Sequence, residues 1–284
     1  MIAAMVIFGT LGPFVRNIPV SSGELALYRG ILAAVLLGLV LLITGQKIPV
    51  AQLKKELVLL LLSGGALGVN WMLLFEAYKH TTVSVATLSY YFAPVLVAAV
   101  CPVLFREKMT PKQILCLIMS TIGLVLVTGI GSLTGQKQHW IGIAFGLGAA
   151  VFYATVVILN KYIKGVEGLH RTFVQFLSAA AVLIPYVVLT EGISLARVNG
   201  FGWLNLLIVG ILHTGITYCL YFSALKELPG QKAAILSYID PLTAVIISVT
   251  LLGEPLKTQQ ILGGILILGF TLWNELTPYT PKTK

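Results

Sequence analysis

Charged residues are scarce in this chain. Only 10% of its 284 residues are Asp, Glu, Lys or Arg, whereas a soluble globular domain has about 25%. Hydrophobic residues make up 57% of the chain, and its mean hydropathy is +0.95. No stretch is polar enough to form a separate soluble domain. The composition therefore excludes a water-soluble enzyme and indicates an integral membrane protein.

Acidic residues and cysteines are also few. The chain has 10 acidic residues against 19 Lys and Arg, and its 3 cysteines lie in apolar runs without a C-x-x-C pattern. This pattern favours neither a disulfide framework nor a zinc site, so we expect no metal and no cofactor. A basic excess in a membrane protein usually lies in cytoplasmic loops, so we do not expect nucleic acid as a partner.

Long apolar runs are abundant instead. Ten of them approach the length of about 20 residues that crosses a hydrocarbon core of about 30 Å. Assigning the loops to alternate sides places 13 Lys and Arg on one side and 5 on the other. Because basic loops stay in the cytoplasm, the sequence predicts an all-α fold of ten transmembrane helices with both termini cytoplasmic. The expected spans lie near residues 1–15, 25–44, 57–78, 83–105, 113–131, 140–160, 172–190, 203–225, 230–252 and 258–275.

The two halves of the chain repeat each other at a constant offset of 147 residues. The offset pairs Lys79 with Lys226, Pro94 with Pro241, Glu107 with Glu254, Gln113 with Gln260 and Tyr91 with Tyr238. Each half holds five spans, an odd number, so the second half must enter the membrane inverted. We expect a first five-helix repeat at 1–131, a connecting loop at 132–139, a second, inverted repeat at 140–275 and a cytoplasmic tail at 276–284.

Several motifs resemble those of the drug/metabolite transporter superfamily, specifically its ten-helix EamA-type carriers. They are AxxxFGTLGPFVR (Ala4 to Arg16), LSYYFAP (Leu88 to Pro94), LSYIDP (Leu236 to Pro241), FREKMTPKQ (Phe105 to Gln113) and LGEPLKTQQILGG (Leu252 to Gly264). The resemblance implies a 5+5 inverted-repeat carrier of small organic solutes, often an exporter of amino acids or related metabolites.

The function expected is secondary active transport of a small organic solute across the cytoplasmic membrane by alternating access, with protons as a candidate coupling ion. The partners are then a small-molecule substrate and the lipid bilayer. A membrane-embedded enzyme and a channel-like facilitator are the alternatives. The sequence has no H-E-x-x-H motif and no Gly-rich phosphate loop, which argues against the enzyme.

Polar side chains inside the spans are the candidates for a substrate site, because each is costly in hydrocarbon unless it faces the bundle interior or water. Asn70 and Thr217 occupy matching repeat positions, as do Trp71 with Tyr218 and Tyr91 with Tyr238. We expect these six residues to line one central cavity. The alternative for any single residue is a hydrogen bond between helices.

Asp240 and His213 are the candidate proton-coupling residues. Asp240 is the only aspartate of the chain and lies within a span, where a carboxylate needs a proton, a cationic partner or water. The alternative role is to bond backbone groups freed beside Pro241. Pro94 and Pro241 are the candidate hinges, because each lacks an N–H in mid-span.

Three other charged residues are given structural roles. Arg29 can clamp a substrate carboxylate or extend outward to the interface, and the second is the expectation. Glu107 and Glu254 are expected to complement the N-terminal dipole of the helix that follows each of them.

The 13-to-5 bias gives a direct test of topology. In a cysteine-free background, Gln136→Cys should react with an impermeant maleimide on intact cells, and Thr110→Cys should not, because only the first lies outside. Equal labelling of the two positions would contradict this topology.

Overall fold

The computed structural model describes residues 1–46, 50–104, 109–128, 137–166, 168–228 and 236–276. Every regular element in these ranges is a helix. Six segments are long and apolar enough to cross a membrane: Ser22–Ile43, Val50–His80, Val83–Cys101, Lys137–Tyr162, Gly168–Glu191 and Gly200–Ala224. Ile2–Arg16, Pro111–Val127 and Ile239–Thr250 are apolar helical segments of shorter length. The chain is thus an all-helical, multi-pass membrane protein, and the count of ten spans stays a prediction.

The helices are joined by short connections in most places. They are α1 (Ile2–Gly9), α2 (Leu11–Arg16), α3 (Ser22–Ile43), α4 (Val50–His80), α5 (Val83–Tyr90), α6 (Ala93–Leu104), α7 (Pro111–Thr128), α8 (Lys137–Tyr162), α9 (Gly168–Tyr186), α10 (Gly200–Leu207), α11 (Thr217–Glu227), α13 (Ile239–Thr250) and α14 (Thr258–Glu275). Two π-helical stretches, η1 (Val187–Glu191) and η3 (Ile208–Ile216), and a 3-10 turn, η2 (Leu195–Arg197), complete the set.

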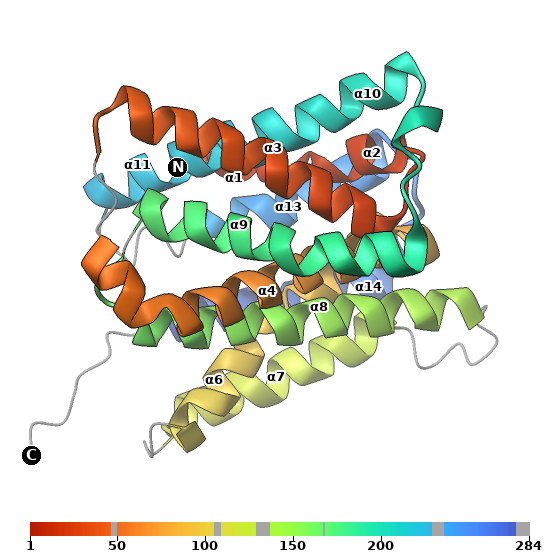
Figure 1. Ribbon diagram of the computed structural model, residues 1–284. Coiled ribbons are helices and arrows are strands. Elements are labelled where there is room, and N and C mark those ends of the chain that lie inside the picture. Colours follow the sequence, from red (N-terminus) through yellow and green to blue (C-terminus); the bar gives the residue numbers. More distant parts are fainter. Residues whose placement is uncertain (47–49, 105–108, 129–136, 167, 229–235, 277–284) are drawn as a thin grey trace, which may run out of the picture.

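Helices of the first part of the chain, residues 1–131, pack between helices of the second part, residues 140–275 (Figure 1). α4 packs against α8 and α9, α3 packs against α9 and η3, and α7 pairs with α14. The N-terminal helix α1 packs on α13, near the other end of the sequence. Neither part therefore forms a bundle of its own, and the space at their junction is shared by both.

The predicted boundary between the two parts lies close to the start of α8. The helix begins at Lys137, so the last three residues of the expected loop 132–139 are already helical. The rest of that loop and the tail from 277 onward lie outside the described residues.

Close helix packing depends on glycine at specific positions. A Cβ added to Gly64 of α4 would lie 2.5 Å from Cβ of Ser178 and 2.8 Å from Cα of Gln175, both on α9. On α7, a Cβ at Gly123 would lie 2.7 Å from the carbonyl oxygen of Gly263 on α14. Small residues let transmembrane backbones approach in this way, where dispersion contacts replace the hydrophobic effect as the driving force.

Three helices are interrupted within the apolar region. α1 ends at Gly9 and α2 begins at Leu11, α5 ends at Tyr90 and α6 begins at Ala93, and a turn at Tyr238 precedes α13. Pro94 and Pro241 each lie in the first turn of the helix after a break, where a missing N–H leaves no helical bond unmade. The breaks themselves fall three residues earlier, at Tyr91 and Tyr238.

The tight contact at Gly64 predicts a stability difference between two glycines. Gly64→Ala should destabilise the protein by about 1–3 kcal/mol, because the new methyl group meets α9 backbone that cannot move aside. Gly269→Ala in α14 is the matched control, since no atom lies within 4 Å of its added Cβ. Melting temperatures in detergent compare the two. An equal effect of both substitutions would show that this contact is not close-packed.

Candidate functional site

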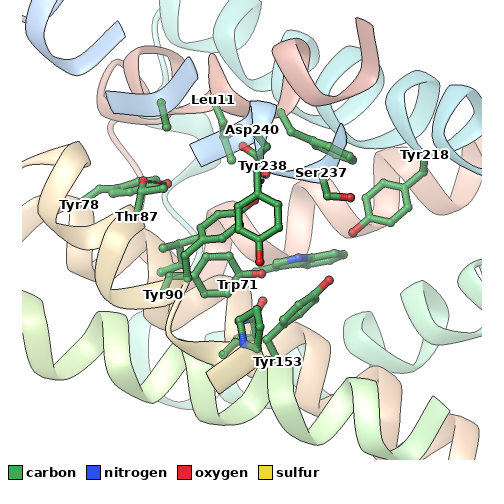
Figure 2. Close-up of a pocket in the computed structure, with 18 of the residues that line it drawn as sticks. Leu11, Trp71, Tyr78, Thr87, Tyr90, Tyr153, Tyr218, Ser237, Tyr238 and Asp240 are labelled. Atoms are coloured by element: carbon green, nitrogen blue, oxygen red, sulfur yellow. Dashed lines mark hydrogen bonds between the residues drawn. The ribbon is translucent and has the colours of Figure 1, made fainter. Parts of the chain in front are cut away.

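A cavity of about 280 Å³ lies where the interrupted helices meet (Figure 2). Its walls come from α1, α2, α3, α4, α5, α6, α8, α11 and α13, and thus from both parts of the chain. This volume is near the lower end of small-molecule sites, which suits a compact organic solute. The lining residues are Phe8, Gly9, Leu11, Arg29, Asn70, Trp71, Leu74, Tyr78, Thr87, Tyr90, Tyr91, Ala93, Pro94, Tyr153, Tyr218, Ser237, Tyr238, Asp240 and Ala244.

Aromatic rings make up much of the wall. Tyr90 contacts Tyr91 edge-on with ring centroids 5.6 Å apart, and it contacts Tyr153 of α8 at 5.5 Å. Tyr218 meets Phe8 of α1 at 5.3 Å in the same edge-on manner. In Figure 2 the hydroxyl groups of Tyr153 and Tyr218 point toward the same part of the cavity. Such a wall combines apolar surface with a few directional hydrogen-bonding groups, as ligand pockets do.

Five of the six residues expected to bind substrate line this cavity. They are Asn70, Trp71, Tyr91, Tyr218 and Tyr238. Asn70 also ties α4 to α8, because its amide donates to the carbonyl of Ala149 at 2.7 Å.

Thr217, the sixth residue, does not line the cavity. Its hydroxyl donates to the carbonyl of Leu212 at 2.6 Å, at the end of the π-helical stretch η3. The hydroxyl is thus satisfied within its own helix, so Thr217 neither lines the cavity nor forms the hydrogen bond between helices that was the alternative.

Asp240 lies in the first turn of α13 and lines the cavity. Its Oδ2 accepts a hydrogen bond from the Tyr91 hydroxyl at 2.5 Å. The bond joins the break between α5 and α6 to the start of α13, so it links the two matching interruptions directly. Within the described part of the chain, Asp240 has no cationic partner.

His213 is not among the residues that line the cavity, and no hydrogen bond joins it to Asp240 among the described residues. Its ring is only 1% exposed, with Nε2 3.0 Å from Thr10 Oγ1 and the Phe14 ring at a centroid distance of 4.8 Å. Thr10 marks the break between α1 and α2. The imidazole therefore contacts the α1–α2 break, whereas Asp240 bonds Tyr91 at the α5–α6 break.

Arg29 does not take the position expected from the sequence, which was an outward extension to the membrane interface. The side chain is 4% exposed and lines the cavity, so it does not extend outward. Its Cζ lies 4.5 Å from the centroid of the Trp71 ring, and its Nε donates to Thr214 Oγ1 at 3.0 Å. An arginine inside an apolar span was the available signal, but the sequence alone does not show which way its side chain points.

Tyr153 is a lining residue that the repeat could not have identified. The offset of 147 pairs it with Val6, so no matching aromatic residue points to it. It lines the cavity because α8 lies against α5 and α6.

A cluster of polar contacts surrounds Glu254. Arg16 Nη1 lies 2.5 Å from Glu254 Oε1, and Arg16 Nη2 donates to the carbonyl of Thr81 at 3.1 Å. Glu254 Oε2 accepts from the Val83 amide at 2.8 Å and from the Ser248 hydroxyl. The expected role of Glu254 is thus corrected, because it caps the N-terminus of α5 instead of that of α14. Gly253, with φ of 63°, makes the turn that directs the side chain back.

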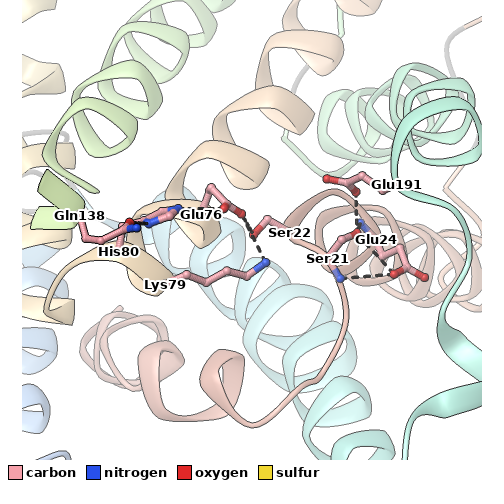
Figure 3. Close-up of polar contacts among 8 residues, drawn as sticks. All are labelled: Ser21, Ser22, Glu24, Glu76, Lys79, His80, Gln138 and Glu191. Carbon is pink, nitrogen blue, oxygen red and sulfur yellow. Dashed lines mark hydrogen bonds and ion pairs between the residues drawn. The ribbon is translucent and has the colours of Figure 1, made fainter. Parts of the chain in front are cut away.

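Further polar contacts join the ends of neighbouring helices (Figure 3). The Ser22 hydroxyl donates to Glu76 at 2.6 Å, and Glu76 also contacts Lys79 at 3.3 Å and His80 at 3.1 Å. His80 Nδ1 lies 2.6 Å from Gln138 on α8. These contacts join α3, α4 and α8 where the chain is predicted to face the outside.

The Glu24 carboxylate links the loop that follows α9 to the start of α3. Glu24 completes a capping box with Ser21 at the start of α3. It also accepts from the Ser194 amide at 2.6 Å and from the Ser194 hydroxyl. The Ser21 hydroxyl donates to Glu191 at 2.5 Å, so two glutamates share the same serine-rich turn.

Comparison with known proteins gives consistent matches. The sequence model of the EamA-like transporter family matches residues 1–129 and again residues 140–274. The uncharacterized transporter YxxF of Bacillus subtilis is 31% identical over 268 residues, covering 94% of this chain and 85% of that protein. An uncharacterized transporter of Archaeoglobus fulgidus is 32% identical over 202 residues, covering 70% of each chain. A protein of known crystal structure has the same fold, with a TM-score of 0.68 at 19% identity over 97% of this chain and 94% of that one.

The lining predicts which aromatic side chains matter for ligand binding. Trp71→Ala and Tyr218→Ala should each weaken binding of any cavity ligand by about tenfold, since a large aromatic contact surface is lost. Phe201→Ala, at a ring that is 60% exposed on α10, is the matched control. Ligand-dependent melting shifts of the purified variants measure the effect. Equal shifts in all three variants and the wild type would contradict a ligand site here.

Proposed function

The chain belongs to the EamA-like transporter family, and we propose that it is a secondary active transporter moving a small organic solute across the cytoplasmic membrane by alternating access. The observation that carries the proposal is the aromatic cavity at the meeting point of the helix breaks. Transporters of duplicated architecture place their substrate site at such a point, between the repeats and near the middle of the bilayer.

The proposed architecture is ten helices in two inverted five-helix repeats, 1–131 and 140–275, joined by 132–139, with both termini and the tail 276–284 in the cytoplasm. Helix bounds support it at the offset of 147. α7 (Pro111–Thr128) corresponds at both ends to α14 (Thr258–Glu275), and α6 (Ala93–Leu104) is displaced by one residue from α13 (Ile239–Thr250). The two separate matches to the family model point the same way.

Packing between helices supports the repeat independently. A Cβ on Gly68 would lie 3.2 Å from Leu183 Cδ1, and a Cβ on Gly215 would meet the side chain of Leu36. Both the glycines and the leucines are related by the offset of 147. The contact of α4 with α9 thus has a counterpart in the contact of η3 with α3, as a pseudo-two-fold axis requires.

The Arg16–Glu254 cluster is the proposed closure of the outward end. Arg16 and the Val83 amide come from the first repeat, and Ser248 and Glu254 come from the second. Alternating access requires that contacts between the repeats close one end while the other end opens. Breaking this cluster is then a necessary step toward the outward-open state.

The hinges of this exchange are proposed to be the breaks at Tyr91 and Tyr238, with Pro94 and Pro241 starting the next helices. A broken helix can rotate its two halves with little loss of helical hydrogen bonding. The cavity also contains both break residues, so ligand contacts and hinge motion are directly connected.

Asp240 is the proposed proton-coupling residue, and His213 is the second candidate. Asp240 lines the cavity and bonds the opposite break through Tyr91, so a proton on its carboxylate changes both the charge of the cavity and the contact between repeats. A neutral group passes apolar walls at far lower cost than a charged one. His213 lacks contact with the cavity, which ranks it second.

Asp240→Asn tests the coupling, because the amide mimics the neutral carboxyl group permanently. In proteoliposomes the variant should retain exchange of substrate but lose accumulation driven by a pH gradient. Tyr91→Phe, which keeps the carboxylate, should retain that accumulation. If Asp240→Asn vesicles accumulate substrate at the wild-type level, the carboxylate is not the coupling group.

Transport itself is tested by counterflow in the same proteoliposomes. The panel should contain amino acids, amines, organic acids and vitamins, with each labelled solute compared against protein-free vesicles. Saturable counterflow of at least one solute is expected. Conductance that does not saturate would identify a channel-like facilitator.

A further inference from the structure

We infer that Arg29 is an anion-binding residue of the central cavity, and that the transported solute presents a single carboxylate to it. The inference rests on the proposed function and adds the chemical class of the substrate. It starts from the position of Arg29, a buried arginine that lines the cavity.

Three contacts fix the guanidinium group. Its Nε is used by the hydrogen bond to Thr214 Oγ1, and the Thr214 hydroxyl donates its own proton to the carbonyl of Val209 at 2.8 Å. Trp71 covers the group at 4.5 Å and Phe75 at 5.2 Å, measured from Cζ to the ring centroids. These contacts hold the guanidinium in a set orientation, and its Nη1 and Nη2 form no hydrogen bond or ion pair with the described residues.

The positive charge of Arg29 has no counter-charge among the described residues. Every ion pair in that part of the chain involves other groups: Arg16 with Glu254, and Glu76 with Lys79 and His80. Asp240 shares the cavity, but its carboxylate bonds the Tyr91 hydroxyl and forms no ion pair with Arg29. An unpaired buried cation is costly in a membrane, so the cavity must supply water or an anion.

A carboxylate fits the free edge of Arg29. Two parallel N–H donors of a guanidinium group match the two oxygens of a carboxylate in a bidentate pair. The ring-lined remainder of the cavity accommodates an apolar or aromatic body, and the volume of about 280 Å³ limits the solute to a small one.

The charge balance of the cavity restricts the anion to a single negative charge. Arg29 is the only Lys or Arg among the described lining residues, and Asp240 is the only acid there. A phosphate ester with two negative charges would lack a second cation and would face the Asp240 carboxylate. A monocarboxylate satisfies Arg29 alone and leaves Asp240 free for a proton or an amino group of the solute.

Isosteric probe pairs test the inference on the purified wild-type protein. The pairs are 3-phenylpropionate with 3-phenylpropanamide, indole-3-acetate with indole-3-acetamide, and benzoate with benzamide. Titration by ligand-dependent melting shift should give at least roughly tenfold tighter binding of the carboxylate in one pair or more. If no carboxylate in the panel binds better than its amide, the site holds only water and the inference is wrong.

Arg29→Gln tests the residue itself. It should abolish the preference for the carboxylate while leaving binding of the amide unchanged, and Arg29→Lys should restore part of the preference because it keeps the charge. Arg197→Gln, on the exposed turn η2, is the matched control and should behave as wild type. Should Arg29→Gln not fold, Thr214→Val keeps the charge and removes the acceptor for Nε, so it should still weaken carboxylate binding. An unchanged preference in a folded Arg29→Gln variant, or in Thr214→Val where that variant is used instead, overturns the assignment.

The two proposals fail in different ways. Saturable counterflow of neutral and anionic probes at the same rate leaves transport intact and removes the role of Arg29. Selective carboxylate binding without counterflow of any solute leaves the role of Arg29 intact and contradicts transport.

Discussion

Backbone and side-chain polar groups within a lipid bilayer have to find their partners inside the protein, and this constraint shapes the whole molecule. Regular helices meet it through their own hydrogen bonds, and glycines at helix contacts let them pack closely. The helix breaks are where it is hardest to meet. They gather near one cavity, and each has polar side chains beside it: the Tyr91 hydroxyl bonds Asp240 in the cavity, and Thr10 lies beside His213 outside the cavity lining. Irregular backbone is thus confined to places that line a polar space or contact a polar side chain.

Three charged groups illustrate three ways of satisfying the same constraint. Glu254 pairs with Arg16 and caps a helix, so its charge is balanced by the fold. Asp240 has one neutral donor, the Tyr91 hydroxyl, which leaves its charge open to change. Arg29 contacts two aromatic rings and a threonine, but it forms no ion pair with the described residues. The balance of its charge therefore depends on what enters the cavity. In our account, structure, coupling and substrate recognition each rest on one of these cases.

The sequence predicted the membrane class and the family directly, because low charge, apolar runs and paired motifs are local features. The repeat offset also predicted that Trp71 and Tyr218, and Tyr91 and Tyr238, line one cavity. All four residues do line it. The offset failed for Thr217, because the helix before that residue is π-helical and the hydroxyl bonds within it. Tyr153 could not be found by symmetry, since its partner position holds Val6. The orientation of the Arg29 side chain and the contact of Glu254 with α5 depend on how the helices pack, and the spacing of residues along the sequence does not give this packing.

The central claim is that the two repeats exchange conformations around the cavity, and distances between spin labels test it most directly. One pair, Lys79→Cys with Lys257→Cys, spans the repeats at the end closed by Arg16 and Glu254. The other, Thr44→Cys with Glu227→Cys, spans them at the opposite end. On changing pH or adding a transported solute, the account predicts that one distance lengthens while the other shortens. Distances that stay fixed, or that lengthen together at both ends, would contradict it.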